Sequence, residues 1–225
     1  MAERREEKYL IDYTEYALIS RKIRALLPPD KNGINGRYSI CSIYFDDPFD
    51  TALADKEDGN AIHIKYRIRT YDGSKKLIRL ERKTKRGIIT EKDSAIISES
   101  ELCEILVGEA MDENAECFGL ASQMRAKAIR PVLSIRYDRE AYVFPQMGIR
   151  VTFDMNIDAL PPEAEVLFGK NTNPIPALGR NHVIMEVKYS DRCPSFIRKA
   201  CATNGMQISV SKYALCRNAP ILNIY

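Results

Sequence analysis

Apolar and polar positions alternate along several long segments of this chain, a pattern typical of β-strands that bury one face. In segment 61–69, apolar residues occupy every second position, and the positions between them hold a histidine and three cations: His63, Lys65, Arg67 and Arg69. Cations that share one face of a strand repel one another, so such a face must meet solvent or an anion. This charged face is therefore a candidate anion-binding surface.

The same kind of pattern predicts further strands over 6–12, 38–46, 75–86, 88–97, 131–144, 149–157, 183–189 and 207–214. The dipeptide Asp72-Gly73 favours a hairpin between 61–71 and 75–86. Apolar residues at helical spacing predict helices within 14–27, 50–57, 98–129 and 194–202. Segment 161–180 holds four of the eleven prolines and is predicted to be a long loop.

The chain has neither an internal repeat nor a linker-like change in composition, which predicts a single domain over residues 1–225. We expect an α+β fold built on an antiparallel β-barrel of roughly eight strands with peripheral helices. The strand faces opposite the charged ones are strongly apolar, as at Ile78 and Leu80. Helices that cover these apolar faces would turn the charged faces inward, toward a charged lumen.

Composition narrows the possible functions. The net charge is only +3, so bulk charge does not indicate a nucleic-acid partner. No segment approaches the ~20 apolar residues of a membrane span, and the charged N-terminus lacks the apolar core of a signal peptide, so we expect a cytoplasmic protein without direct membrane insertion. The six cysteines show no Cys-x-x-Cys pair and no histidine at zinc-ligand spacing, which favours free thiols in a reducing compartment.

The predicted strands place a set of charged residues on their shared polar faces. The basic members are Lys8, Lys65, Arg67, Arg69, Arg79, Lys83, Arg139, Arg150 and Lys188. The acidic members are Glu6, Glu81, Asp154 and Glu186. Nine cations and four carboxylates give this set a charge of +5, more than the +3 of the whole chain. The cationic excess is thus concentrated on the strand faces.

An open sheet with one face in water is the alternative interpretation of this set. Solvated faces usually mix serine, threonine, glutamine and lysine, whereas arginine, the side chain suited to bidentate phosphate recognition, dominates here. Isolated carboxylates among the cations suit a hard divalent ion such as Mg²⁺ or Mn²⁺. The residues therefore favour a phosphate-chain site that works by positioning and charge neutralisation.

Eight short motifs occur in an order that resembles the VTC domain, the catalytic domain of vacuolar transporter chaperone polyphosphate polymerases. They are Arg4-x-Glu6-x-Lys8-Tyr9, Ser42-Ile43-Tyr44-Phe45-Asp46, Lys65-Tyr66-Arg67-Ile68-Arg69-x-Tyr71, Leu80-Glu81-x-Lys83, Tyr137-x-Arg139, Arg150-Val151-Thr152-Phe153-Asp154, Glu186-Val187-Lys188-Tyr189 and Ser211-Lys212-Tyr213. The VTC domain belongs to the triphosphate tunnel metalloenzymes, with the CYTH phosphatases and cyclases. The resemblance covers nearly the whole chain.

The resemblance implies a β-barrel tunnel in which the γ-phosphate of ATP is transferred to a growing polyphosphate chain with Mn²⁺ or a similar ion. It implies catalytic phosphate contacts at Lys8, Arg67, Arg69, Lys83, Arg139, Lys188 and Lys212. Further substrate-binding positions, from the resemblance or from the strand pattern, are Lys65, Arg79, Tyr137, Arg150 and Ser211. Glu186 resembles the metal ligand, assisted by Glu6 and Glu81.

Some roles stay open at this point. Glu81 is as well explained as a counter-ion as by metal contact, and Asp154 could pair with Arg150. The family pattern leads us to expect a further lysine at Ser209. Strict alternation in 207–214 would place Lys212 on the apolar face, so a bulge would have to redirect it. For Asp46, Asp47 and Asp50, a capped turn is favoured over a metal site.

Three functions compete. The first is a polyphosphate polymerase that uses ATP or another nucleoside triphosphate. The second is a CYTH-like hydrolase of triphosphate or nucleoside triphosphates, and the third is a non-catalytic module that binds polyphosphate, triphosphate or pyrophosphate. Hydrolases of the superfamily often begin with Glu-x-Glu-x-Lys, and Arg4 replaces the first of these glutamates. That difference favours the polymerase.

Overall fold

A computed structural model describes residues 4–87, 89–170, 173–190, 192–209 and 211–219. They fall into two compact units, each described here by itself. Unit 1 comprises Met1–Ser39, Tyr137–Ile157 and Leu178–Val210, and unit 2 comprises Ile40–Arg136, Asp158–Ala177 and Ser211–Tyr225. The division falls within three strands, so the chain passes repeatedly from one unit to the other. That residues 1–225 act as one domain stays a prediction.

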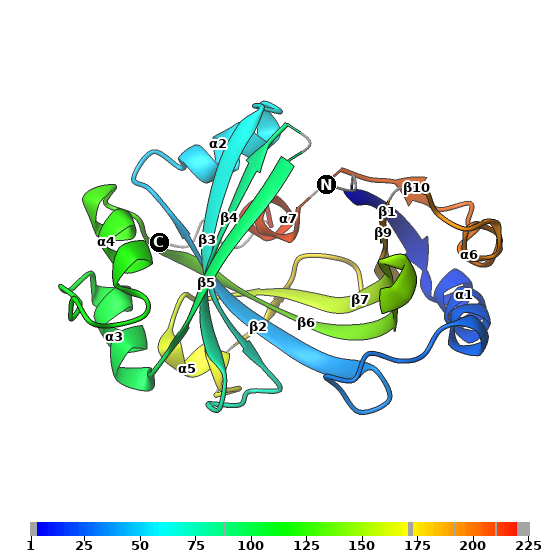
Figure 1. The fold of residues 1–225 in the computed structure, drawn as a ribbon, viewed down its shortest axis with the longest axis horizontal. Coiled ribbons are helices and arrows are strands. Elements are labelled where there is room, and N and C mark those ends of the chain that lie inside the picture. The colour runs from blue at the N-terminus through cyan, green and yellow to red at the C-terminus, as the bar shows by residue number, and fades with distance from the viewer. Residues whose placement is uncertain (1–3, 88, 171–172, 191, 210, 220–225) are drawn as a thin grey trace. The chain divides into compact units, whose positions relative to one another are not determined.

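The described residues form ten strands and seven α-helices, most of which are labelled in Figure 1. The strands are β1 Arg4–Asp12, β2 Arg37–Asp46, β3 Ile62–Tyr71, β4 Ile78–Arg86, β5 Ile89–Ile97, β6 Arg130–Phe144, β7 Ile149–Leu160, β8 Ile175–Pro176, β9 His182–Ser190 and β10 Met206–Gln207. The helices are α1 Tyr13–Leu26, α2 Thr51–Glu57, α3 Glu99–Val107, α4 Phe118–Ala126, α5 Ala164–Leu167, α6 Ser195–Ala200 and α7 Lys212–Arg217. The predicted antiparallel α+β class is confirmed.

In unit 1, β10, β1, β9 and β7 pair in that order, all antiparallel. Helix α1 begins at the N-cap Asp12, whose side chain accepts a hydrogen bond from the Glu15 amide at 2.8 Å. It ends where Pro28-Pro29 cannot continue a helix. Its apolar face joins the inner side chains of β7 and β9 in one buried cluster, and α6 lies beside it (Figure 1). One face of these strands is therefore covered.

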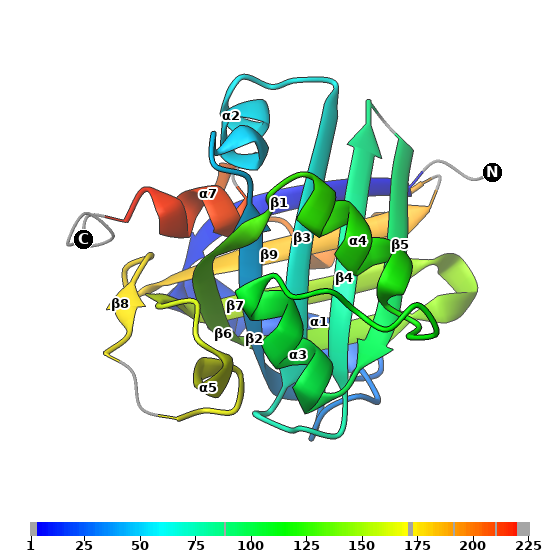
Figure 2. The ribbon, with the colours of Figure 1, turned by 90° about the vertical axis from the view of Figure 1, so that its left-hand side faces the viewer.

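In unit 2, β2, β3, β4 and β5 pair in order, all antiparallel. Helices α3 and α4 lie across one face of these strands (Figure 2), where Leu102 and Met124 share a buried cluster with Ile68 and Leu80. The predicted hairpin is confirmed, since the turn after β3 places Asp72 and Gly73 at φ 50° and 63°. Alternation then sends the predicted charged set of β3 and β4, which includes Arg67 and Glu81, to the face away from these helices.

Two predicted elements are wrong. The strand predicted over 207–214 is limited to β10, and helix α7 begins at Lys212. The Ser211 side chain accepts a hydrogen bond from the Ala214 amide at 3.1 Å, so an N-cap competes successfully with the β-branched run before it. The strand argument about the direction of Lys212 therefore does not apply, and Val210 lies outside the described residues. The loop predicted over 161–180 contains α5 and β8.

All six cysteines are free thiols, as predicted, and four of them are buried. Burial raises the pKa of Cys41, Cys201 and Cys216 to about 12, so these thiols stay protonated and inert at neutral pH. Among the helices of the described residues, none has both the length and the apolar character needed to cross a membrane.

The acidic cluster at the end of β2 forms a capped turn. The buried Asp46 carboxylate accepts hydrogen bonds from the Ala52 amide at 2.9 Å, the Leu53 amide at 3.2 Å and the Tyr213 hydroxyl at 2.6 Å. It thereby holds the start of α2 and a side chain of α7. The predicted role of this cluster as a turn is confirmed.

We expect Asp46→Ala to lower the free energy of unfolding by about 3 kcal/mol, because it leaves several buried donors without an acceptor. The matched control is Asp47→Ala, whose half-buried carboxylate accepts only exposed amides and whose loss should cost about 1 kcal/mol. Urea unfolding of the two variants measures the difference. Equal losses would contradict the assignment of Asp46 as the organising acceptor.

Candidate functional site

The β3–β4 hairpin of unit 2 aligns six of the predicted charged residues. The register pairs Lys65 with Lys83, Arg67 with Glu81, and Arg69 with Arg79. Residues directly opposite each other in an antiparallel pair point to the same face, so the six side chains share one face. Five cations and one carboxylate occupy it, which makes the face strongly electropositive.

Glu81 is the fixed counter-ion of this face. Its side chain is 2% exposed, and it bonds Arg67 Nε at 2.6 Å and Lys92 Nζ at 2.5 Å. Burial alone would raise the pKa of Glu81, but the charges of Arg67 and Arg69 and the hydrogen bonds from Lys92 and Arg67 lower it to about 2. A carboxylate with cations on both oxygens is poorly placed to bind a metal. The geometry favours the counter-ion role for Glu81.

Arg69 is the most informative cation of unit 2. It is 8% exposed, and its Nε donates to the Ser42 hydroxyl at 3.2 Å. Its guanidinium lies 6.0 Å from the centre of the Tyr71 ring. Within the part of the chain that the structure describes, no carboxylate forms an ion pair with Arg69. A buried guanidinium with donors to spare is costly unless an anion meets it, which argues against a simple solvated face.

Tyr44 of β2 also belongs to this site, although it was not among the predicted site residues. Arg67 Nη1 donates to its hydroxyl at 3.2 Å, and its ring stacks on Tyr213 at 5.4 Å between centroids. Burial would raise the pKa of Tyr44, but the charges of Arg67, Arg69 and Lys212 lower it to about 8. The strand register places Tyr44 here, because Ser42 and Tyr44 of β2 lie opposite Arg69 and Arg67 of β3.

The start of α7 brings two more predicted residues to the hairpin. Lys65 Nζ donates to the Ser211 hydroxyl at 3.2 Å and lies 5.4 Å from the Tyr213 ring centre. Lys212 is the first residue of α7, and its charge contributes to the low pKa of Tyr44. Ser211 and Lys212 thus reach the site through a helix N-terminus. Arg79 is half-buried in this unit, and Lys83 is exposed.

In unit 1 the register alternates charge across three strands. Lys188 of β9 lies opposite Glu6 of β1 and Arg150 of β7, and Glu186 lies opposite Lys8 and Thr152 in the same way. Ion pairs join Lys8 to Glu6 at 2.7 Å, Lys188 to Glu186 at 2.5 Å and Lys188 to Glu6 at 3.3 Å. Four predicted site residues therefore form one connected charge network.

Glu186 differs from Glu81 in having an open oxygen. It is 6% exposed, and Lys188 pairs with Oε1. The ion pair of Glu186 involves Oε1 alone, and the buried hydroxyl of Thr152, its cross-strand neighbour, has no hydrogen-bond partner among the described residues. Carboxylate and hydroxyl oxygens suit Mg²⁺ or Mn²⁺. Because no group of three His, Cys, Asp or Glu side chains gathers in the described chain, such an ion would need ligands from substrate or water.

Arg139 and Asp154 form a buried bidentate pair, with Nε to Oδ1 at 2.6 Å and Nη2 to Oδ2 at 2.8 Å. Burial opposes the charge of Arg139, but Asp154 holds its pKa well above the usual value. The Tyr137 ring centre lies 5.3 Å from this guanidinium. The alternative pairing of Asp154 with Arg150 is wrong in geometry, because Arg150 instead bonds Asp30 at 2.8 Å.

Solved structures of other proteins resemble this fold. One of them is a Hippeastrum protein described as a candidate adenylyl cyclase with a dominant triphosphatase activity. It superposes with a TM-score of 0.55 at 14% identity, over 95% of each chain. A Bacillus halodurans protein described as a candidate adenylate cyclase gives 0.49 at 12% identity, over 89% of this chain and 85% of its own. At such identities, the likeness concerns the fold alone.

Residues 3–219 match the family model of the VTC domain. The chain therefore belongs to the VTC domain family. No curated protein matches it.

We expect one tyrosine of the folded protein to ionise near pH 8, and Tyr44→Phe to remove that step from a tyrosinate absorbance titration. Because the pKa of Tyr44 is lower folded than unfolded, its contribution to stability is absent below about pH 8 and complete above about pH 10. Over that window the unfolding free energy of the wild type, relative to Tyr44→Phe, should rise by about 3 kcal/mol. Tyr38→Phe is the control, and an unchanged titration in Tyr44→Phe would contradict the assignment.

Arg139→Ala should lower the free energy of unfolding by about 3–5 kcal/mol, because it removes the bidentate guanidinium partner of the buried Asp154 carboxylate. The double variant Arg139→Met, Asp154→Leu removes both charges and should recover most of that loss. Denaturant unfolding of wild type, single and double variants tests this. A double variant as unstable as Arg139→Ala would show that the pair matters through packing instead.

Proposed function

We propose that this protein is a metal-dependent polyphosphate polymerase that transfers the γ-phosphate of ATP to the end of a polyphosphate chain. The observation that carries the proposal is the state of Arg69: a buried guanidinium with spare donors, in a chain of the VTC domain family. A highly charged phosphate chain is the ligand that best satisfies such a face. The free cysteines agree with a cytoplasmic location.

Neighbouring side chains orient the two central arginines of unit 2 for phosphate binding. Arg67 is oriented by Glu81 and Tyr44, and Arg69 by Ser42, so both guanidiniums are positioned before a phosphate arrives. Positioned donors stabilise the charge that develops on transferring phosphoryl oxygens without reorganising during the reaction. Lys65, Arg79, Lys83 and Lys212 add positive charge in unit 2, as do Lys8, Arg139, Arg150 and Lys188 in unit 1.

Glu186, with Thr152 beside it, would hold the divalent ion, and Glu6 would act through Lys188. A bound ion neutralises phosphate charge and bridges protein to phosphate oxygens. Lys188 bonds both Glu6 and Glu186, which holds both carboxylates in place. Glu81 is engaged by two cations and is assigned to the orientation of Arg67.

A triphosphatase is the second candidate, because the Hippeastrum protein of the same fold is described as having that activity. Such an enzyme would pass the γ-phosphate of a nucleoside triphosphate, or of triphosphate itself, to water. The same cationic faces would bind either substrate. The two functions differ in the acceptor, so their products separate them, and a module that only binds polyphosphate or pyrophosphate would give no product.

The test incubates the protein with ATP and Mn²⁺ and measures ADP, free phosphate and long-chain polyphosphate separately. We expect ADP together with polymer. Free phosphate without polymer would replace the polymerase with the triphosphatase, and binding without turnover would replace both with a polyphosphate-binding module. Glu186→Gln should abolish metal-dependent turnover, whereas Glu165→Gln, an exposed carboxylate paired only with Lys170, should not. Full activity of Glu186→Gln would remove Glu186 from the site.

Arg69→Ala should lower kcat/KM for ATP by at least about 100-fold, since it removes a buried, charge-assisted phosphate contact. Arg69→Lys should recover only part of this loss, because an ammonium cannot reproduce a bidentate contact. Arg86→Ala is the matched control: an exposed arginine at the end of the same hairpin, offset by one residue from the charged face. Equal effects of Arg69→Ala and Arg86→Ala would indicate a general charge effect.

A further inference from the structure

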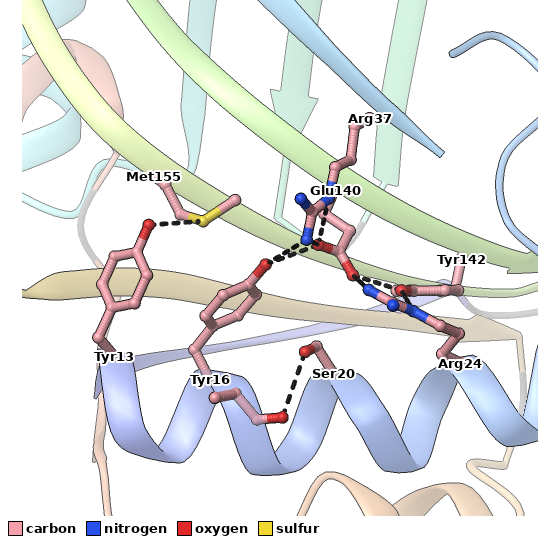
Figure 3. Close-up of polar contacts among 9 residues, drawn as sticks. Tyr13, Tyr16, Ser20, Arg24, Arg37, Glu140, Tyr142 and Met155 are labelled. Atoms are coloured by element: carbon pink, nitrogen blue, oxygen red, sulfur yellow. Dashed lines mark hydrogen bonds and ion pairs between the residues drawn. The ribbon is translucent and has the colours of Figure 1, made fainter. Parts of the chain in front are cut away.

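A cationic pocket in unit 1 is lined by residues that do not belong to the charged strand faces described above. It has a volume of about 630 Å³, and its lining residues are Arg24, Pro29, Ile34, Asn35, Arg37 and Tyr142. None of these residues belongs to the sets assigned to phosphate or metal binding. Figure 3 shows Arg24 and Arg37 converging from α1 and β2 on Glu140 of β6.

The turn before β2 fixes one wall of this pocket. Asn35 and Gly36 have φ of 54° and 77°, and the Arg37 amide donates to the Ile34 carbonyl at 3.0 Å. A Cβ at Gly36 would lie 2.6 Å from the Ala141 carbonyl oxygen, so only glycine lets the turn approach β6 this closely. The chain therefore places Arg37 at a defined position beside Tyr142.

Glu140 holds both arginines in place (Figure 3). Its side chain is completely buried and accepts from Arg37 Nε at 2.8 Å, Arg24 Nη2 at 3.2 Å and the Tyr16 hydroxyl at 2.6 Å, and also from the Tyr142 hydroxyl. Burial would raise the pKa of Glu140, but the hydrogen bonds from Tyr142, Tyr16 and Arg37 lower it. The carboxylate therefore remains ionised and orients two guanidiniums at once.

The outer edges of these guanidiniums are open. The Arg24 and Arg37 side chains are 61% and 58% exposed, and within the described part of the chain their hydrogen bonds and ion pairs use Nε and Nη2, not Nη1. Two cations against one carboxylate leave one surplus positive charge. Rigid guanidinium edges with free donors match the paired oxygens of a phosphoryl or carboxylate group.

Neutralising the buried Glu140 carboxylate requires one arginine, so a purely structural role does not explain why both Arg24 and Arg37 are present. One guanidinium and two tyrosine hydroxyls already supply the Glu140 carboxylate with several donors, and an additional half-exposed ion pair contributes little to stability. The pocket is also larger than one inorganic ion needs, and Pro29 and Ile34 give it an apolar wall.

We propose that Arg24 and Arg37 form a second ligand site, which binds the phosphoryl or carboxylate group of a small organic anion. The ligand's oxygens meet the two Nη1 edges, and its less polar part lies against Pro29 and Ile34. The site is independent of the proposed polymerase reaction, because it shares no residue with it.

The test follows the Nε–H signals of Arg24 and Arg37 by NMR during titration of the full chain carrying Arg69→Ala, which weakens binding at the first site. Phenyl phosphate and citrate are the probes for phosphoryl and carboxylate ligands. We expect saturable shifts of both signals with at least one probe. Shifts with phenyl phosphate alone assign a phosphorylated ligand, and shifts with citrate alone assign a carboxylate.

Arg24→Gln added to this background should weaken binding at least about tenfold, because it removes one guanidinium while Arg37 still neutralises Glu140. Arg21→Gln, which removes an exposed arginine of the same helix, is the control and should leave affinity unchanged. Absence of shifts with both probes would overturn the proposal, as would equal affinity in Arg24→Gln and Arg21→Gln. If Arg24→Gln fails to fold, the NMR shifts of the Arg69→Ala protein alone test the proposal.

Discussion

The charged site depends on the burial of the opposite strand faces. In unit 2, Ile68 and Leu80 pack beneath α3 and α4, and this packing sets the rotation of β3 and β4. Side chains alternate with a period of two, so the packing also decides where Arg67, Arg69 and Glu81 point. A slip of one residue would bring cations into the apolar cluster. Hydrophobic burial therefore supplies the free energy that holds like charges side by side.

The same constraint operates in unit 1 with a different balance of charge. Val151, Phe153 and Met185 pack with α1, and the intervening positions of β7 and β9 carry Thr152 and Glu186. Here carboxylates and lysines alternate across the register, so the network is close to neutral. A nearly neutral network with one open carboxylate oxygen suits an ion and its phosphate ligands, whereas the cationic face of unit 2 suits phosphate alone.

The sequence predicted the strands and faces well because alternation and turn chemistry are local. The Asp72-Gly73 turn and the apolar positions of α1 determine their own structure within a few residues. The contacts that it missed are set by register or by competition between local preferences. Tyr44 joins the site because β2 aligns it with Arg67, and Asp154 meets Arg139 although Arg150 is closer to it in sequence. At Ser211 an N-cap prevailed over a run of β-branched residues.

Buried charge distinguishes three kinds of arginine in this protein. Arg139 has a carboxylate on two of its nitrogens, so of the three kinds it depends least on a bound anion. Arg24 and Arg37 share one carboxylate and keep open edges at the surface. Arg69 is buried with only a hydroxyl bonded to its Nε, which is the least favourable state for a guanidinium without a ligand. A fold retains such an unfavourable group only where a partner compensates it. The less completely carboxylates pair with an arginine here, the more strongly that arginine indicates a bound anion.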